Sequence, residues 1–252
     1  MIEFSDFSKS YKTSFSKKSL FSVENISFKV EDSSVTGLIG ANGSGKTTII
    51  KAACAFHYPD RGSIYITGKD GKKIDITLQP EKAMEEIGYV PEKTLLPPDM
   101  TVKEFLHYCA SLHSLCGEQE TNSIKKVISD CSLEDVLDKK IKQLSKGYGQ
   151  RLSFAQALIH NPQNLILDEP FSGLDPSQII SIRKLIERLS AEKAVLLSTH
   201  ILSEVSSLCS KMCIMKLGQL AATGTEAQII EQTSAPSFEA AFLKLTEKGS
   251  QK

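Results

Sequence analysis

The sequence predicts an α/β fold in which helices cover both faces of a parallel sheet. Three runs of strand length are almost wholly apolar: residues 34–40, 164–168 and 194–199. Segments with helical character follow each of the first two runs. Continuous apolar strands that alternate with helices are typical of parallel sheets buried on both sides.

The N-terminal third contributes strands and one helix. Residues 25–30, "NISFKV", alternate apolar and polar side chains, which predicts a half-buried and antiparallel strand. The run 34–40 then enters a glycine-rich turn, and residues 46–57 have helical composition up to Pro59. "SIYITG", residues 63–68, reads as a further strand that ends at a glycine.

The stretch from about residue 92 to residue 160 is helical in character. Thr101 and Glu104 form a capping-box pattern at the start of one helix. One face of that helix is apolar, through Val102, Phe105, Leu106, Cys109 and Leu112. Residues 122–137 continue with helical segments, so we expect a helical insertion between strands.

The last third returns to the α/β pattern. Asp175 and Pro176 mark a helix start, because Asp caps a helix and Pro fits its first turn. The expected buried face of that helix carries Ile179, Ile182, Leu185, Ile186 and Leu189. From Thr225 onward we expect two short helical segments, interrupted near Pro236.

Composition limits the partners and the compartment. Lys plus Arg and Asp plus Glu are both 30, so the chain lacks the basic excess typical of nucleic-acid binding. No basic leader precedes an apolar run, and no stretch nears the roughly 18 apolar residues that span a bilayer. We therefore expect a cytosolic chain. The six cysteines form no paired C-x-x-C set, which favours reduced and mostly buried thiols; Cys209 and Cys213 are spaced to meet across one helical turn.

"GANGSGKT", Gly40 to Thr47, matches the phosphate-binding pattern G-x-x-x-x-G-K-[ST]. Its glycines let backbone N–H groups turn inward around phosphates at the positive end of the following helix. Lys46 would reach the terminal phosphates, and the Thr47 hydroxyl would ligate Mg²⁺. A glycine-rich turn with a surface lysine is the alternative, but the strand before and the helix after favour phosphate binding.

Two carboxylates and a histidine follow buried strands. Asp168, in "LILDEP", is placed to hold Mg²⁺ through water, and Glu169 could polarise an attacking water. His200 ends "AVLLSTH", at the carboxyl edge where open α/β sheets bind ligands. That placement favours a γ-phosphate contact over an ordinary surface histidine.

The ordered set "GANGSGKTT", "GYVPE", "LSKGYGQRL", "LILDEP", "SGLDP" and "STH" resembles the nucleotide-binding subunit of an ABC transporter. The resemblance spans about residues 2–225 and is nearest to bacterial export ATPases that work with separate permeases. It implies a P-loop NTPase (RecA-like) core, an antiparallel β subdomain near the N-terminus and an inserted α-helical subdomain. The implied single domain is 1–225, with core 1–91 and 161–225 and helical part 92–160. Residues 226–252 form a short helical tail.

The resemblance implies a head-to-tail dimer that sandwiches two ATP molecules with Mg²⁺. Glu169, His200 and Lys46 take the catalytic positions, and Thr47, Asp168 and Glu92 take the metal positions. Ser172 and Asp175 would lie across the dimer interface. Residues implied to wrap the phosphates are Gly40, Asn42, Gly43, Ser44, Gly45, Lys46, Thr47 and Thr48.

Three positions depart from the family pattern or leave it open. Lys146 and Tyr148 replace a glycine and a glutamine of the usual signature, whereas Ser145 and Gly147, implied to meet the partner's γ-phosphate, are kept. Glu92 stands where most relatives have Gln, and either a ligand or a simple loop residue is consistent with it. Tyr11 matches the aromatic that stacks on adenine, with Phe15 or Phe21 as alternatives.

The implied function is ATP hydrolysis that drives transport, in the export direction, through a separately encoded integral membrane permease. The chain would then be cytoplasmic and peripheral on the inner face of the membrane, touching the permease near "KTLLPPDM", residues 93–100. Its partner is a second copy or a related ATPase, and no nucleic acid is expected. A soluble ABC ATPase acting on ribosomes or DNA is the alternative, but such chains usually carry two units, a coiled coil or a basic surface. A regulator without turnover would lack Glu169 or His200.

Overall fold

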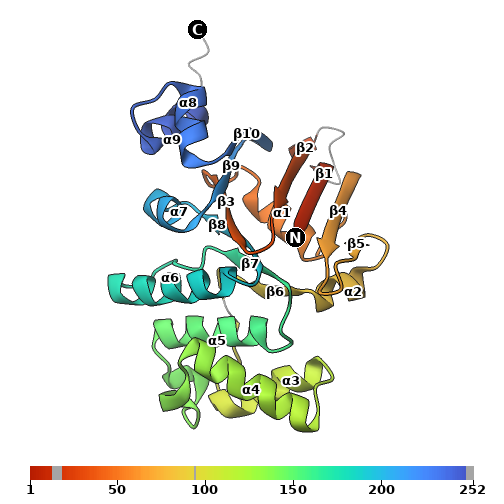
Figure 1. Ribbon diagram of the computed structural model, residues 1–252, viewed down its shortest axis with the longest axis vertical. Coiled ribbons are helices and arrows are strands. Elements are labelled where there is room, and N and C mark those ends of the chain that lie inside the picture. Colours follow the sequence, from red (N-terminus) through yellow and green to blue (C-terminus); the bar gives the residue numbers. More distant parts are fainter. Residues whose placement is uncertain (13–18, 94, 248–252) are drawn as a thin grey trace.

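The computed structural model describes residues 1–12, 19–93 and 95–247 and contains two sheets (Figure 1). The larger sheet has six strands in the order β10-β9-β3-β8-β7-β6. Five of them are parallel, and β10 pairs antiparallel with β9 at one edge. The strand bounds are β3 Ser34–Gly40, β6 Ile87–Val90, β7 Asn164–Asp168, β8 Ala194–Thr199, β9 Lys211–Lys216 and β10 Gln219–Gly224.

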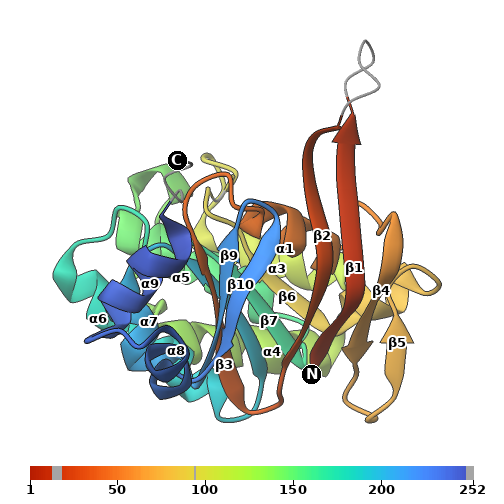
Figure 2. The same ribbon diagram turned by 90° about the horizontal axis from the view of Figure 1, so that it is seen from above.

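The smaller sheet is antiparallel and stands beside the larger one (Figure 2). Its order is β2-β1-β4-β5, and it contains the strand expected at residues 25–30. The bounds are β1 Ile2–Lys12, β2 Ser19–Val30, β4 Arg61–Thr67 and β5 Lys73–Asp75. The expectation of an antiparallel sheet near the N-terminus is confirmed.

Nine α-helices and two 3-10 turns complete the described part of the chain. Three of these helices, α3 to α5, follow β6 and precede β7, and they lie together at the bottom of Figure 1. The first helices are α1 Lys46–Ala53, α2 Pro80–Glu85, α3 Val102–Leu112, α4 Gly117–Cys131 and α5 Lys146–Leu158. The later helices are α6 Pro176–Ser190, α7 Leu202–Leu208, α8 Glu226–Thr233 and α9 Phe238–Thr246. The 3-10 turns are Glu134–Val136 and Ile141–Gln143. A division of the chain at residues 92 and 160 stays a prediction.

Alternate residues of each buried strand face different cores. In β7, Leu165 and Leu167 pack with the apolar faces of α3, α4, α5 and α6. Ile166, which lies between them, packs with α1 and with the smaller sheet. Both faces of the parallel sheet are therefore covered, as expected, but one is covered largely by a second sheet and not by helices alone.

Local signals in the sequence place most helix starts correctly. Thr101 Oγ1 accepts from the Glu104 amide, and the Glu104 carboxylate accepts from the Thr101 amide at 2.7 Å. The expected apolar face of α3 is buried except at Leu112, which is 65% exposed. Leu112 is the last residue of the helix and lies beyond the core that covers the preceding turns.

Helix α1 ends four residues earlier than expected. Ala55 takes a left-handed φ of 54°, and the Phe56 amide donates to the Lys51 carbonyl at 2.9 Å. This turn closes the helix after Ala53, although the composition stays helical up to residue 57. The backbone hydrogen bonds that end the helix leave no clear mark in the composition.

The C-terminal third holds two strands that periodicity did not indicate. β9 and β10 form a hairpin against β3, and Met212 and Ile214 pack on α8 and α9 through Ile229, Phe238 and Ala241. Cys213 lies in β9 and Cys209 follows the end of α7, so these two thiols do not share a helical turn. The six cysteines are free, and four of them are buried. In the described ranges no helix is long and apolar enough to cross a bilayer.

Candidate functional site

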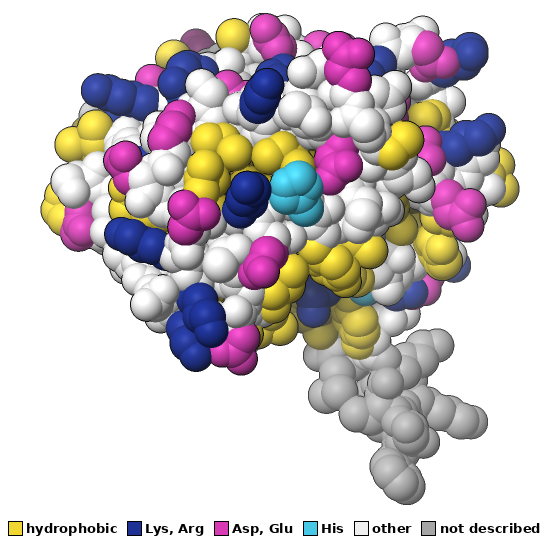
Figure 3. Space-filling model, turned by 90° about the horizontal axis from the view of Figure 1, so that it is seen from below, with side chains coloured by type: hydrophobic (Ala, Val, Ile, Leu, Met, Phe, Trp, Pro, Cys, Tyr) yellow, Lys and Arg dark blue, Asp and Glu magenta, His cyan; other side chains and the backbone are white. Residues whose placement is uncertain are grey.

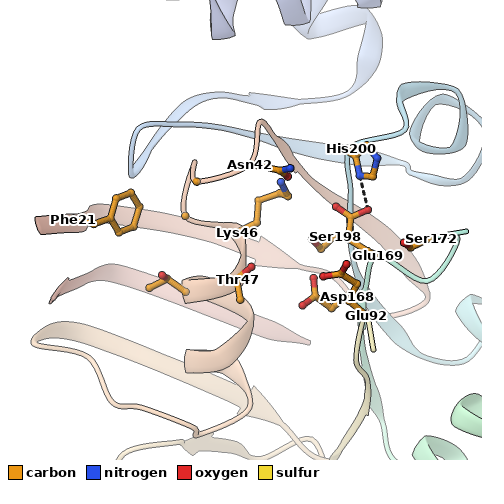
Figure 4. A pocket seen from close by; sticks show the side chains of 13 residues that line it. Phe21, Asn42, Lys46, Thr47, Glu92, Asp168, Glu169, Ser172, Ser198 and His200 are labelled. Atoms are coloured by element: carbon orange, nitrogen blue, oxygen red, sulfur yellow. Dashed lines mark hydrogen bonds and ion pairs between the residues drawn. The ribbon is translucent and has the colours of Figure 1, made fainter. Parts of the chain in front are cut away.

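A cavity of about 440 Å³ opens at the carboxyl ends of β3, β7 and β8 (Figure 4). Parallel α/β sheets bind ligands at this edge, because loops from neighbouring strands meet there. Thirteen residues line it: Phe21, Asn42, Gly43, Gly45, Lys46, Thr47, Thr48, Glu92, Asp168, Glu169, Ser172, Ser198 and His200. Residues from five separate stretches of sequence thus converge on one space.

The loop between β3 and α1 has a backbone that only glycine adopts readily. Gly43 and Gly45 have φ values of 79° and 114°. A Cβ on Gly40 would lie 2.5 Å from Ser44 Oγ and 2.6 Å from the Met215 carbonyl oxygen, so the loop closes tightly on itself. Gly45 is the N-cap of α1 and offers no side-chain acceptor, which leaves the first amides of the helix available to an anion.

Lys46 lies in the wall of the cavity and is 7% exposed. Its Nζ donates to the Gly40 carbonyl at 2.6 Å and to the Ala41 carbonyl at 3.4 Å. Burial lowers the pKa of Lys46, while the carboxylates of Glu169 and Asp168 oppose that shift. The ammonium group is thus held inside the loop, next to the space that the loop encloses.

The hydroxyl of Ser44, in the loop itself, is buried without a hydrogen-bond partner in the described part of the chain. Buried hydroxyls are normally hydrogen-bonded, so Ser44 Oγ calls for a polar group that the protein itself does not supply. A phosphate or its ordered water supplies such a group.

Asp168 and Glu169 follow each other at the end of β7 but have different surroundings. Burial raises the pKa of the Asp168 carboxyl, and the neighbouring carboxylates of Glu169 and Glu92 raise it further. Glu169 has a left-handed φ of 47°, and its amide donates to the Ser198 carbonyl at 2.9 Å. That turn directs the two successive carboxylates into the same cavity.

The oxygen atoms at this edge suit a magnesium ion. Thr47 offers a hydroxyl and Asp168 a carboxylate, and Glu92 lies in the same wall. Within residues 1–12, 19–93 and 95–247 no group of three or more His, Cys, Asp or Glu side chains could hold a metal alone. Mg²⁺ commonly binds through one or two carboxylates together with substrate phosphates, so the donor set fits an ion that arrives with a nucleotide.

His200 and Glu169 contact each other across the cavity mouth. His200 Nδ1 lies 2.8 Å from Glu169 Oε2, and the dashed line in Figure 4 marks this contact. The His200 side chain is 59% exposed, whereas that of Glu169 is 12% exposed. The histidine therefore faces outward while it holds the carboxylate in place.

Three residues expected to face a partner, and also Gly40, Ser44 and Tyr11, do not line this cavity. Ser145 lies in the wall of a separate cavity of about 410 Å³, which shares Glu92 and Ser172 with the first cavity. Ser145 caps α5, and its Oγ accepts from the Tyr148 amide at 3.4 Å. Asp175 caps α6 and accepts from the Gln178 amide at 2.9 Å.

Gly147, the third of these residues, lies within α5 against α6. A Cβ on Gly147 would be 2.8 Å from the Gln178 side chain. Within one chain, Ser145, Gly147 and Asp175 therefore lie apart from the residues of the phosphate loop. For these three residues to contact a bound nucleotide, the nucleotide would have to lie in the cavity of another copy of the chain.

The aromatic wall of the cavity is Phe21 and not Tyr11. Tyr11 pairs with Phe21 across β1 and β2, but its hydroxyl contacts His57 Nε2 at 2.6 Å and it is absent from the lining. Phe15, the other alternative, lies outside the described residues. The family motif indicates an aromatic in this region, and only the strand pairing identifies the one that reaches the cavity.

Sequence reasoning missed Ser198 and the contact of Lys146. Ser198 lies near the carboxyl end of β8 and His200 directly follows that strand, so the strand-end argument that identified His200 could also have identified Ser198. Lys146 lies over Gly173, where a Cβ would meet its Nζ at 2.0 Å. No sequence pattern predicts that contact, because it joins the first residue of α5 to a turn that lies far along the chain.

Comparisons with known proteins agree on one family. A family model described as "ABC transporter" matches residues 23–172. The Nod factor export ATP-binding protein I of Burkholderia thailandensis is 34% identical over 210 residues, which cover 83% of this chain and 67% of that protein. A solved structure described as the ATP binding subunit of an ABC transporter superposes with a TM-score of 0.82 at 28% identity, covering 98% of this chain and 99% of that one.

A third match concerns the fold alone. A dimeric ATP-binding cassette, described in a post-hydrolysis state with ADP and Pi, has a TM-score of 0.75 at 23% identity. It covers 89% of this chain and 98% of that chain. The expected P-loop NTPase architecture is confirmed by these likenesses.

Proposed function

This chain belongs to the ABC transporter family as an ATP-binding and ATP-hydrolysing subunit, and from this premise we propose that it powers export through a separate membrane permease. The observation that carries the proposal is the convergence on one cavity of Lys46, Asp168, Glu169 and His200. A cavity of about 440 Å³ lies within the usual range for small-molecule sites.

The loop 40–48 binds the phosphates of ATP. Its backbone amides and the N-terminus of α1 face the negative charge, and Ser44 Oγ gains the partner that it lacks. Lys46 exchanges its contact with the Gly40 carbonyl for a phosphate oxygen. The Phe21 ring, in the same wall, stacks on adenine.

Thr47, Asp168 and Glu92 would hold Mg²⁺, which would supply positive charge to the phosphates. Ionised Asp168 is the form that such an ion favours. Because burial and the neighbouring carboxylates raise its pKa, the apo site resists that ionisation. Metal binding is therefore expected to strengthen as the pH rises.

Glu169 orients the attacking water and accepts its proton. His200 fixes the Glu169 carboxylate through their 2.8 Å contact, and its side chain lines the cavity in which we place the γ-phosphate. Developing negative charge on the phosphoryl group is stabilised by Lys46 and by the loop amides. The protein accelerates this reaction by positioning the reactants and by electrostatic stabilisation, without forming a covalent bond to the substrate.

A second copy completes each site. Ser145 and Gly147 lie at the N-terminus of α5, a helix end suited to an anion, yet they are outside the cavity of their own chain. A head-to-tail homodimer brings this helix end to the partner's γ-phosphate, with Ser172 and Asp175 between the two sites. The dimeric cassette with the same fold supports this arrangement.

The permease contact lies on the loop between β6 and α3. Leu95 in this loop is 96% exposed, and Tyr108 and Leu112 on α3 are 50% and 65% exposed. Figure 3 faces this end of the molecule and shows hydrophobic side chains gathered in patches there. A chain attached in this way is peripheral on the cytoplasmic face of the membrane. The export direction is supported by the Nod factor export relative.

Glu169→Gln tests the assignment of the base. The variant keeps the size of the side chain and its contact with His200 but loses the proton acceptor. We expect ATP turnover to fall about 10²- to 10⁴-fold, while ATP-dependent dimerisation persists and becomes longer-lived. Equal turnover by wild type and variant would sink the assignment.

A further inference from the structure

The turn between β9 and β10 contacts the back of the phosphate loop. β3 and β9 are parallel neighbours, with Gly40 opposite Met215, so the segments that follow them lie side by side. Leu217 and Gly218 form a two-residue turn, with φ values of 47° and 83°. The Gly218 amide donates to the Ser44 carbonyl at 2.9 Å.

This hydrogen bond fixes the orientation of one peptide unit in the loop. In a trans peptide the carbonyl and the following N–H point in opposite directions, and the described chain has no cis peptide. With the Ser44 carbonyl held outward by Gly218, the Gly45 N–H points the other way. Gly45 lines the nucleotide cavity, and that cavity is where such an N–H can meet the phosphates.

The turn is itself held from the other side. The Gly218 carbonyl accepts from the Glu24 amide in β2 at 2.9 Å. A Cβ at position 218 would lie 1.9 Å from the Ser22 carbonyl oxygen, which is backbone and cannot move aside freely. Gly218 is thus packed between β2 and the phosphate loop, and any larger residue at this position would move the turn away from Ser44.

Gly45 itself cannot supply this orientation. Its φ of 114° is strained for other residues but accessible to glycine along with many alternatives, so the loop peptide needs an external constraint. Among the described residues, no hydrogen bond is made by the Gly45 amide. An amide N–H that has a fixed orientation and no hydrogen-bond acceptor is preorganised to donate a hydrogen bond to an anion.

We propose that Gly218 is a positioning residue for the phosphate loop, one that orients the Gly45 N–H toward the nucleotide phosphates through the Ser44 carbonyl. The inference rests on the proposed function, because it assigns a support to the same phosphate site. It differs from a merely structural role, in which the turn would stabilise the hairpin and affect every ligand equally.

A backbone ester isolates the hydrogen bond. A synthetic peptide of residues 213–252 that carries an ester in place of the Leu217–Gly218 amide is ligated at Cys213 to residues 1–212, which replaces one N–H by oxygen. ATP, ADP and adenosine are then competed against a fluorescent ATP analogue, with the all-amide ligated chain as control. We expect ATP and ADP to bind about 3- to 10-fold more weakly, and adenosine to bind as in the control.

Two substitutions give an independent comparison. Gly218→Ala adds the clash with Ser22, and Gly71→Ala adds a methyl to a turn with φ of 74° and open space around it. Gly218→Ala should weaken ATP at least about tenfold, and Gly71→Ala should leave it within twofold. Unchanged ATP binding by the ester, or equal losses for ATP and adenosine, would overturn the positioning role. Failure of the all-amide control to bind ATP would instead refute the proposed function.

Discussion

Replacing Ser145 by Ala separates the contribution of this side chain to stability from its contribution to ATP hydrolysis. In the free chain, Ser145 Oγ makes one capping hydrogen bond, from the Tyr148 amide at 3.4 Å. A bond of that length lies at the long limit, so the cap contributes about 0.5 kcal/mol, the low end for a Ser-to-Ala change. For a chain of this size the loss corresponds to a fall in Tm of roughly 1–2 °C.

The effect on hydrolysis should be far larger. In the proposed closed dimer the same hydroxyl would face the partner's γ-phosphate, and removal of one such donor typically costs about 10²- to 10³-fold in kcat. Steady-state ATP turnover and thermal unfolding of the same preparations measure both quantities. Ser237→Ala is the matched control, because Ser237 caps α9 through the Ala240 amide at 3.2 Å and lines neither of the two cavities described above.

The two variants should therefore agree in stability and differ in activity. Ser237→Ala should lose a comparable 1–2 °C or so and keep its turnover. If Ser145→Ala lost only the activity that its small loss of stability explains, the partner-facing role would be refuted. If Ser237→Ala lost activity equally, the effect would belong to helix capping and not to the phosphate contact.

Two further outcomes follow from the cavity. Asp168→Asn should abolish hydrolysis but raise the Tm of the nucleotide-free chain at neutral pH, because the folded-state pKa of Asp168 is raised and its ionisation therefore costs stability. The difference in Tm between the variant and the wild type should be largest above the folded-state pKa of Asp168 and should vanish below its unfolded-state pKa of about 4. A variant Tm below that of the wild type at neutral pH would contradict this reasoning. Phe21→Ala should weaken ATP and adenosine alike, by about 5-fold or more, whereas Tyr11→Ala should not; competition binding compares them, and the reverse order would restore Tyr11 as the stacking residue.

The sequence predicted the parts of this site that are contiguous along the chain. The loop 40–48, the pair Asp168 and Glu169, and His200 each end a strand, and parallel strands bring their ends to one edge. The sequence alone therefore predicts that these residues share one cavity. The same holds for the caps at Thr101 and Asp175, whose partners are three residues away.

Features that depend on pairing between distant segments were not predictable in this way. The choice of Phe21 over Tyr11 depends on the register of β1 against β2, which alternation alone does not fix. The support that Gly218 gives to Ser44 depends on β9 being the neighbour of β3. β9 itself carries a continuous apolar run of only four buried residues, too short for periodicity to distinguish a strand from a helix.

In the proposed dimer each ATP site is built from two chains, and a mixture of two inactive variants tests this arrangement. Lys46→Ala removes the phosphate lysine, and Ser145→Ala removes the partner-facing hydroxyl. In a mixed dimer both lesions fall in one site, and the other site keeps its Lys46 and its Ser145. An equal mixture should regain about a quarter of wild-type turnover, because half of randomly formed dimers are mixed and each has one intact site of two. Turnover that stays at the level of the separate variants would contradict a site shared between chains.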